Sequence, residues 1–336
     1  MSHRRQRVAM KEQADLTISD RLKLNLGLRA NNYRVQKKNY TSIEPRATLI
    51  WDIKNQWFAK VAYSKMQQNV HLLTNNGVGF QNDIWVPSTD NISPQKSEQW
   101  ALGISKYLKN MDLDISFEAY YKKMTDLIDY KEGINIISSS TNWAKTVETN
   151  GEGISKGLEF FIHRKSGRLN GFVSYTLSKT DRQFKNINNG EVYPFRYDNP
   201  HNFAATFNYQ INKKWDFSGT WVFKTGAPIT LPLYAIEAGP PQPGVYFIYS
   251  KRNEYRLPNY HRLDIGANRT TVSAKGRKRT LSFSVFNAYN RENVFYIVIT
   301  NKNTYNRQTG KEEISQVLKE KSLFPILPSI SYSQSF

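Results

Sequence analysis

The stretch MDLDISFEAYYK, residues 111–122, alternates strictly between two kinds of side chain. Apolar and aromatic residues occupy every second position, namely Leu113, Ile115, Phe117, Ala119 and Tyr121. Mostly charged and polar residues lie between them, namely Asp112, Asp114, Ser116, Glu118, Tyr120 and Lys122. Because successive side chains of a β-strand point to opposite faces, this stretch predicts a strand with one apolar and one charged face.

The same alternation recurs along the whole chain. It is found in residues 22–28, 47–53, 57–63, 100–105, 158–162, 173–177, 203–211, 215–223, 263–267, 281–285 and 330–336. Together with residues 111–122 and a strand before the turn at 19–21, these segments give about thirteen strands. Residues 311–320 come nearest to an amphipathic helix, and they are compatible with a helical or an extended conformation.

The predicted connections between strands are of two kinds. Short polar connections fall at 19–21, 54–56, 109–110, 165–168, 212–214 and 274–278. They alternate with longer connections near 34–42, 67–95, 131–150, 182–199, 226–257 and 301–312, several of which hold Gly, Pro and Asn. Short turns on one side and long loops on the other predict an antiparallel up-and-down meander, as in outer-membrane barrels.

Composition agrees with a transmembrane β-barrel. No run of the 336 residues approaches the roughly 18 apolar residues of a membrane-spanning helix, but barrel strands need only alternate residues to be apolar. Aromatic residues make up 13%, as expected of interfacial girdles. The chain has no cysteine, which excludes disulfides and thiolate metal sites. The net charge of +19 is spread over turns and polar faces without a compact patch, so we interpret it as solvated.

The strand count predicts an incomplete barrel. The first and last strands run toward the short-turn side, whereas bacterial single-chain barrels have an even number of strands with both ends on that side. The basic N-terminal stretch has no apolar core and is not a signal peptide. We therefore expect residues 1–336 to be the C-terminal piece of a larger barrel. Alone it would expose two unpaired edges, so we expect no closed monomer.

The sequence resembles the C-terminal part of the β-barrel of a TonB-dependent outer-membrane receptor, of the type common in Bacteroidota. The resemblance is carried by residues 22–33, 43–51, 57–73, 85–108, 115–130, 155–182, 193–232, 260–268, 281–296 and 328–336. It implies about the last 13 strands of a 22-stranded barrel, without its plug domain, TonB box and early strands.

The resemblance also implies a function, a location and partners. It implies energy-coupled import of a siderophore, haem, vitamin or glycan across the outer membrane, with no cofactor. The implied partners are outer-membrane lipid and lipopolysaccharide, the barrel-assembly machinery, a small-molecule or oligomeric ligand, and TonB through the absent plug.

Two long connections hold candidate ligand contacts. In residues 72–95, Phe80 and Trp85 accompany Asn75, Asn76, Asp83 and Asp90, and aromatic and amide groups can grip a ligand by stacking and hydrogen bonds. The alternative is a loop that packs on its neighbours and on the membrane surface. In residues 192–203 the candidates are Tyr193, Phe195, Arg196 and Tyr197.

Residues 192–203 also have a structural interpretation, which the sequence favours. Arg196 is able to clamp an anionic ligand, while Asp198 could cap the turn or pair with Arg196. The tripeptide Asp198–Asn199–Pro200 is strong turn chemistry, and this favours a structural role over binding.

Polar-face charges and the C-terminus complete the candidate sites. Five charged residues are expected to line the lumen and to pair with a plug, namely Glu118, Lys122, Glu159, Arg262 and Asp264. The terminal strand, with Ile330, Tyr332 and Phe336, is expected from the resemblance to act as the assembly signal. The alternative is an edge strand with a lipid-facing side.

The sequence offers no support for an enzyme. It has no phosphate-binding Gly-rich loop and no HExxH. The histidines at 3, 71, 163, 201 and 261 are not spaced as metal ligands, so no metal site is predicted. Two rival functions remain. One is a passive porin-like or structural barrel. The other is a soluble basic nucleic-acid-binding protein, which would leave a dozen apolar faces exposed.

Overall fold

The computed structural model describes residues 5–79, 83–133, 143–240, 244–249, 251–274, 276–306 and 310–335. The described residues form an all-β structure, in which the helical elements are three single 3-10 turns. These turns are η1 (Lys109–Met111), η2 (Trp143–Lys145) and η3 (Asn188–Gly190). The all-β prediction is confirmed.

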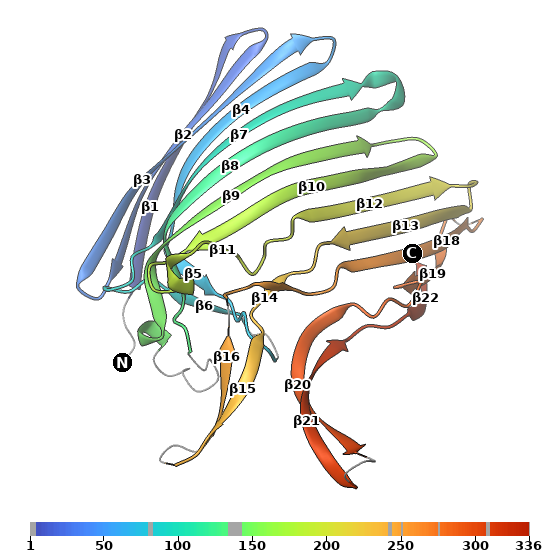
Figure 1. Ribbon diagram of the computed structural model, residues 1–336. Coiled ribbons are helices and arrows are strands. Elements are labelled where there is room, and N and C mark those ends of the chain that lie inside the picture. Colours follow the sequence, from blue (N-terminus) through green and yellow to red (C-terminus); the bar gives the residue numbers. More distant parts are fainter. Residues whose placement is uncertain are drawn as a thin grey trace.

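A fourteen-stranded antiparallel sheet forms the curved wall in Figure 1. Thirteen of its strands follow one another in chain order, and β11 (Tyr193–Pro194) pairs only with β10. The thirteen are β1 (Arg5–Ser19), β2 (Leu22–Val35), β3 (Lys38–Lys54), β4 (Trp57–Gln68), β7 (Gln95–Leu108), β8 (Leu113–Tyr130), β9 (Val147–Arg164), β10 (Leu169–Gln183), β12 (His201–Gln210), β13 (Trp215–Lys224), β18 (Tyr260–Val272), β19 (Lys278–Phe286) and β22 (Leu327–Gln334). This matches the predicted count, and within the described residues no ladder joins β1 to β22.

The strand register collects the apolar side chains on one face of the wall. Trp100 of β7 lies opposite Tyr121 of β8, and Leu102 lies opposite Ala119, which in turn lies opposite Leu158 of β9. Trp100 and Leu102 are 54% and 59% exposed. A one-residue slip would move every such side chain to the other face, so the apolar surface itself specifies the register.

The two ends of the wall differ as the sequence predicts. Short turns join the strands at one end, for example at 54–56, where Lys54, Asn55 and Gln56 all have positive φ. Most connections at the other end are long and carry small sheets of their own. These are β5 (Val70–Leu73) with β6 (Ile84–Pro87), β14 (Pro228–Ile229) with β17 (Tyr255–Arg256), β15 (Pro232–Ala238) with β16 (Gly244–Tyr249), and β20 (Val294–Asn306) with β21 (Lys311–Ser322).

One predicted long connection is wrong. At 34–42, β2 and β3 continue into a hairpin whose turn is Gln36 and Lys37. There the backbone ladder continues although the apolar alternation fades, because strand ends in water need no apolar face. The segment 301–312 lies in the long connection between β19 and β22 and belongs largely to the β20–β21 hairpin, and residues 311–320 are extended rather than helical.

The buried core lies at the long-loop end. One cluster joins the segment between β4 and β7 to β8 and β9, and it contains Leu73, Val86, Ile92, Ile128, Tyr130 and Val147. A second contains Leu127, Phe184, Ile187 and Tyr193, and a third contains Ile229, Leu257 and Ile297. The loops therefore pack as a folded layer across one end of the wall.

Candidate functional site

A buried carboxylate organises the loop layer. Asp129, at the end of β8, is only 1% exposed, and the guanidinium of Arg252 donates to its Oδ1 at 2.6 Å. The hydroxyl of Tyr193 donates to its Oδ2 at 2.9 Å. Three connections that are distant in sequence thus converge on one carboxylate. A buried charge of this kind is tolerated only when it is paired and hydrogen-bonded.

A second guanidinium lies beside this pair. Arg182, at the end of β10, is buried, stacks over the Phe195 ring at 3.6 Å from its centroid, and donates to the carbonyl of Ile128 at 3.4 Å. Burial lowers the pKa of Arg182, and Asp129 opposes that effect. Burial raises the pKa of Tyr193, and the negative charge of Asp129 raises it further, so the phenol remains protonated.

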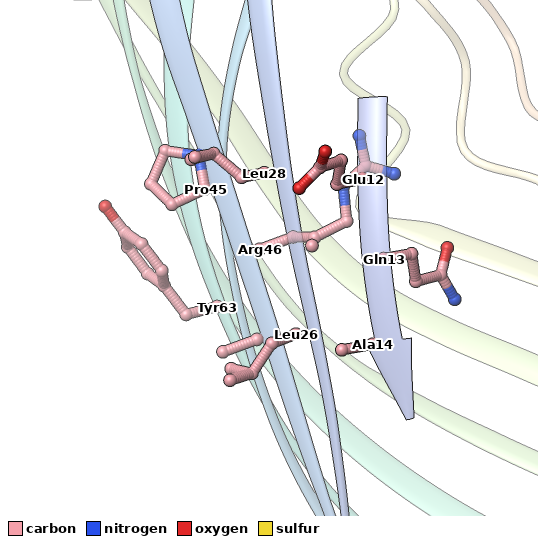
Figure 2. A pocket seen from close by; sticks show the side chains of 10 residues that line it. Glu12, Gln13, Ala14, Leu26, Leu28, Pro45, Arg46 and Tyr63 are labelled. Atoms are coloured by element: carbon pink, nitrogen blue, oxygen red, sulfur yellow. The ribbon is translucent and has the colours of Figure 1, made fainter. Parts of the chain in front are cut away.

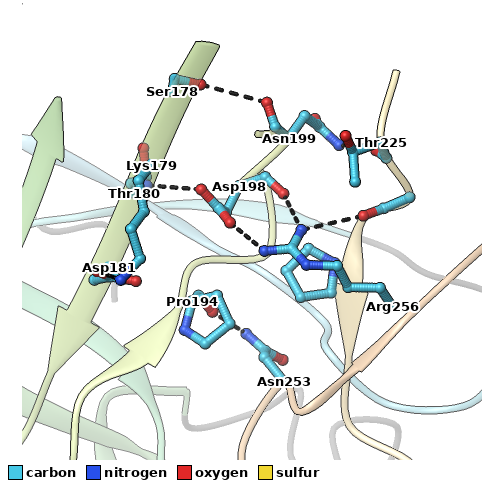
Figure 3. A network of polar contacts seen from close by, with 12 residues as sticks. Ser178, Lys179, Thr180, Asp181, Pro194, Asp198, Asn199, Thr225, Asn253 and Arg256 are labelled. Carbon is cyan, nitrogen blue, oxygen red and sulfur yellow. Dashed lines mark hydrogen bonds and ion pairs between the residues drawn. The ribbon is translucent and has the colours of Figure 1, made fainter. Parts of the chain in front are cut away.

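A second buried carboxylate fixes the turn at 198–200, as Figure 3 shows. Asp198 accepts the backbone N–H of Thr180 at 2.7 Å and is paired with the guanidinium of Arg256. Arg256 also donates to the carbonyl of Asp198 at 2.8 Å, and the Asn199 side chain donates to the carbonyl of Thr225 at 2.7 Å. The partner of Asp198 in this turn is Arg256 and not Arg196, and the structural role of the turn stays a prediction.

The two candidate ligand loops meet at an exposed pair. The hydroxyl of Tyr197 donates to Asp83, 114 residues away in sequence. Burial and this hydrogen bond raise the pKa of Tyr197 to about 12, so the hydroxyl is a donor at neutral pH. Tyr197 is 54% exposed, and Trp85, two residues after Asp83, is 63% exposed. Both aromatic side chains are therefore accessible, and the Tyr197 hydroxyl is held by a carboxylate.

The predicted ligand contacts divide into accessible and buried residues. Trp85 and Tyr197 are accessible, and ligand contact stays a prediction for both. Tyr193 is buried against Asp129, and buried Arg196 donates to the carbonyl of Pro228 at 2.9 Å. Phe195 makes an edge contact with the Tyr197 ring, with centroids 5.6 Å apart. Phe80 lies outside the described residues.

The predicted lumen residues lie on the face opposite the apolar one. Glu118 pairs with Lys60 Nζ at 2.5 Å and lies opposite Glu159 in the β8–β9 register. Arg262 and Asp264 pair with each other at 2.9 Å. Lys122 shares the Glu118 face of β8. Their contact with a plug stays a prediction.

The C-terminal strand carries part of the predicted assembly signal. Ile330 lies opposite Phe283, and Tyr332 lies opposite Leu281, so both continue the apolar face and are exposed. Phe336 lies outside the described residues. Recognition by the assembly machinery stays a prediction.

The sequence pattern did not find Asp129, Arg182, Arg252 and Arg256. Arg252 and Arg256 lie in the segment KRNEYR at 251–256, within the predicted long connection at 226–257. The available signal was a pair of arginines four residues apart in a connection with few acidic residues. That signal does not identify the carboxylates that the arginines meet.

The described residues hold no group of three or more His, Cys, Asp or Glu placed to bind a metal ion. Among them no helix has the length and apolarity to cross a membrane. A shallow hollow of about 370 Å³ lies on the wall between β1 and β4, with Ala14, Leu26, Ala47 and Tyr63 among its lining residues (Figure 2). These four follow one another across the strand register on the apolar face, far from the loop layer.

The family model described as "TonB dependent receptor-like, beta-barrel" matches residues 12–288. No curated protein matches the sequence. Three solved structures are similar over 98% of this chain. They are the ferripyoverdine receptor of the outer membrane of Pseudomonas aeruginosa (14% identity, TM-score 0.60, 39% of that chain), the FrpB iron transporter from Neisseria meningitidis (12%, 0.60, 45%) and the ferric citrate transporter FecA (10%, 0.59, 45%).

At these identities the similarity to solved structures shows the fold alone. The chain spans about two fifths of the length of the structures it matches. The Bacteroidota type of the resemblance is not tested by these matches and stays a prediction.

Proposed function

Since the chain belongs to the TonB-dependent receptor β-barrel family, we propose that it forms part of the wall and outer loops of an outer-membrane receptor that imports its ligand with energy supplied through TonB. The observation that carries the proposal is the register-locked apolar face, which continues across the wall from β1 to β22. Such a face is stable where lipid covers it. The direction of transport and the energy source in this proposal are taken from the family to which the chain belongs.

In this proposal the chain binds and encloses but performs no chemistry. Trp85 and Tyr197 contact the ligand at the mouth, with Asp83 holding the Tyr197 hydroxyl in place. The lumen charges, such as Glu118 and Arg262, face a plug that belongs to the complete receptor. The assembly machinery recognises the terminal strand, and lipid and lipopolysaccharide surround the wall.

We propose an anionic iron chelate as the first ligand class to test. The matched structures include a ferripyoverdine receptor and a ferric citrate transporter, which gives the starting class. The net charge of +19 raises the local concentration of anionic solutes, and aromatic rings at the mouth suit chelators with planar groups.

Uptake by cells that express the receptor containing this chain tests the proposal. Radiolabelled ferric siderophores, ferric citrate, haem, cobalamin and an oligosaccharide are supplied with and without a protonophore. We expect one of them to accumulate only when the proton gradient is intact. Accumulation that the protonophore does not reduce would indicate a passive pore. If none of the probes accumulates, the proposal of import is contradicted.

The loop contacts are tested in the same assay. Trp85→Ala is expected to weaken capture roughly threefold to tenfold, the loss of one aromatic contact. The matched control is Tyr305→Ala, which removes an aromatic of equal exposure from the β20 hairpin strand. Equal losses of ligand capture in both variants would show that Trp85 is not part of the binding surface.

A further inference from the structure

A group of basic residues gathers at the short-turn end of the wall, on the strands that come late in the chain (Figure 1). The β12–β13 and β18–β19 turns lie side by side there, because β13 pairs with β18. The backbone N–H of Thr270 donates to the carbonyl of Lys214 at 2.7 Å and so joins the first turn to β18. The basic residues of these turns and strand ends, which we call the basic rim, are Lys213, Lys214, Arg269, Arg277, Lys278 and Arg279.

The strands that carry the basic rim supply almost no acidic residues. Residues 265–291 contain no Asp or Glu, and Asp216 is the one acidic residue between 199 and 223. Asp216 lies opposite Asn268 in the register, and the Asn268 amide donates to it at 2.8 Å. Because Asn268 precedes Arg269 in the strand, this pair lies on the opposite face of the wall.

Other short turns of the wall carry acids beside their basic residues. The carboxylate of Asp52 accepts the backbone N–H of Lys54 at the 54–56 turn, and Asp114 pairs with Lys165 at 2.6 Å. Positive charge at the short-turn end is therefore balanced locally on the earlier strands and concentrated on the later ones.

Two arginines of the basic rim lie on the apolar face of the wall. Arg269 is opposite Trp215 of β13 on one side and opposite Leu281 of β19 on the other. Arg279 is two residues from Leu281 along β19, so the two arginines are diagonal neighbours on the same face. Both side chains are exposed. Two guanidinium groups thus share one side of the sheet with its apolar side chains.

Aromatic and amide groups surround these two arginines. The Arg269 guanidinium lies over the Trp215 ring, 6.0 Å from its centroid. Arg279 Nε donates to Oε1 of Gln334 at 3.2 Å, and the Tyr332 hydroxyl donates to the same oxygen at 3.0 Å. Among the described residues neither guanidinium has a carboxylate partner, so their terminal nitrogens remain available to an anion. We call these five residues the arginine site.

An exposed apolar row adjoins the arginine site on the side nearer the middle of the wall. Phe217 lies opposite Ala267, which lies opposite Phe283, and Phe283 lies opposite Ile330. Phe217, Phe283 and Ile330 are all exposed. A ligand that covers both surfaces must carry an anionic group at one end and hydrocarbon at the other. A free phosphate or an acidic protein surface uses the charge but leaves the apolar row uncovered.

We infer that the arginine site binds the phosphate of an anionic phospholipid whose acyl chains lie along Phe217 and Phe283. Guanidinium groups bind phosphate through paired N–H donors, and aromatic girdles lie where a barrel wall meets the headgroups. The short turns of such a barrel face the periplasm, so the lipid belongs to the inner leaflet of the membrane. The lysines of the basic rim add attraction for anionic headgroups. The inference rests on the proposed function, because lipid meets this face only if the wall spans a membrane.

Lipid titration of the receptor that contains this chain tests the inference. The receptor is purified in detergent, and phosphatidylglycerol or phosphatidylethanolamine with the same acyl chains is added. Native mass spectrometry then measures the number of bound lipids and their affinity. We expect a tightly bound phosphatidylglycerol that phosphatidylethanolamine replaces poorly and that glycerol phosphate, which has no acyl chains, does not displace. Equal binding of the two lipids, or displacement by glycerol phosphate, would overturn the inference.

Charge-removing variants locate the lipid. Arg269→Gln with Arg279→Gln is expected to weaken phosphatidylglycerol binding about tenfold or more, the loss of charge-assisted hydrogen bonds. The matched control is Lys123→Gln with Lys156→Gln, which removes two exposed charges from diagonal neighbours on the same face at the long-loop end. The control is expected to change the affinity less than about twofold. Equal losses in both double variants would show that the arginine site is not where the lipid binds.

Two further double variants separate a lipid site from simple attraction of negative charge. Arg269→Lys with Arg279→Lys keeps the charge but removes the paired donors, so we expect affinity between that of the native receptor and that of the Gln variant. Lys213→Gln with Lys214→Gln removes two charges from the adjacent turn and is expected to weaken binding less than about threefold. A larger loss from the turn lysines than from the arginines would indicate a surface for acidic proteins and contradict the lipid site.

Failure of this inference is distinguishable from failure of the proposed function. The receptor is also mixed with vesicles of phosphatidylethanolamine alone and of phosphatidylethanolamine with phosphatidylglycerol, and insertion is measured by flotation after an alkaline wash. A receptor that inserts into both vesicles but shows no preference for phosphatidylglycerol contradicts the arginine site alone. A receptor that inserts into neither contradicts the membrane wall on which the proposed function depends, and the lipid site with it.

Discussion

The wall and the loop layer follow opposite rules of burial. Along the wall the large apolar side chains point outward and remain exposed, as Leu102 does, and Ala101 is the described buried apolar residue at mid-strand. In the loop layer the apolar side chains are buried in three clusters, and the charges of Asp129 and Asp198 are buried with them. This contrast is the one expected of the proposed receptor, in which lipid covers the wall and the loops fold in water as an ordinary globular layer.

The largest effect is expected from Asp129→Ala, which should disrupt the loop layer. Asp129→Ala leaves Arg252 and Arg182 buried without their carboxylate, and removing one partner of a buried pair costs about 3–5 kcal/mol. We expect the loop layer to open while the wall ladder remains, measured by hydrogen exchange of residues 193–197 against residues 113–121.

The matched control for Asp129 is Asp114→Ala, which breaks the exposed pair with Lys165 at the short-turn end. It should leave exchange in the loop layer unchanged. Equal protection of residues 193–197 in both variants would show that the buried pair does not hold the loops.

The next effect tests the wall. Leu102→Arg places a charge near the middle of the apolar face and is expected to destabilise the inserted protein by about 2–4 kcal/mol. Ser105→Arg puts the same side chain on the opposite face of β7 and should cost far less. Urea titrations in bilayers compare the two, and equal costs would mean that lipid does not meet the Leu102 face.

A smaller effect is the pH dependence of the loop layer. Burial lowers the pKa of His71 to about 4, while an unfolded histidine titrates near pH 6.5. As the pH falls from about 6.5 to about 4, the unfolded state binds the proton first, so the stability of the loop layer decreases. The loss should reach up to about 3 kcal/mol by pH 4.

Exchange of the β5–β6 amides, corrected for the intrinsic pH dependence of exchange, measures this loss. His71→Gln should remove the dependence between pH 6.5 and 4. If the stability of the loop layer still falls as steeply with pH in that variant, a group other than His71 is responsible. The wall, in contrast, should show little change over the same interval.

The smallest effect concerns ion pairs on the wall surface. Lys65 and Glu98 pair at 2.9 Å with both side chains largely exposed. Lys65→Ala should cost less than about 1 kcal/mol, because exposed pairs are screened and lose side-chain entropy. A double-mutant cycle with Glu98→Ala measures the coupling, and a value comparable to the loss at Asp129 would erase the contrast between the two regions.

The success of the sequence interpretation differs between the same two regions. The strands were predictable because alternation is local, and each strand face carries its own signal, as Phe117 and Glu118 do. At 34–42 that signal faded before the strands ended. Ligand contact by Trp85 and Tyr197 stays a prediction, and the hydrogen bond between Tyr197 and Asp83 joins residues 114 apart in sequence, which no local pattern indicates.

By itself the sequence determined the all-β architecture, the number of wall strands, the apolar face of the wall and the family resemblance. It did so because a membrane wall imposes a period of two on every strand independently of the others. Only the tertiary structure decided that Asp129 is shared by Tyr193 and Arg252, that Asp198 pairs with Arg256, and that the backbone of Asn76 bonds to that of Thr230. Such contacts depend on how separate loops converge in space, and no local pattern encodes that convergence.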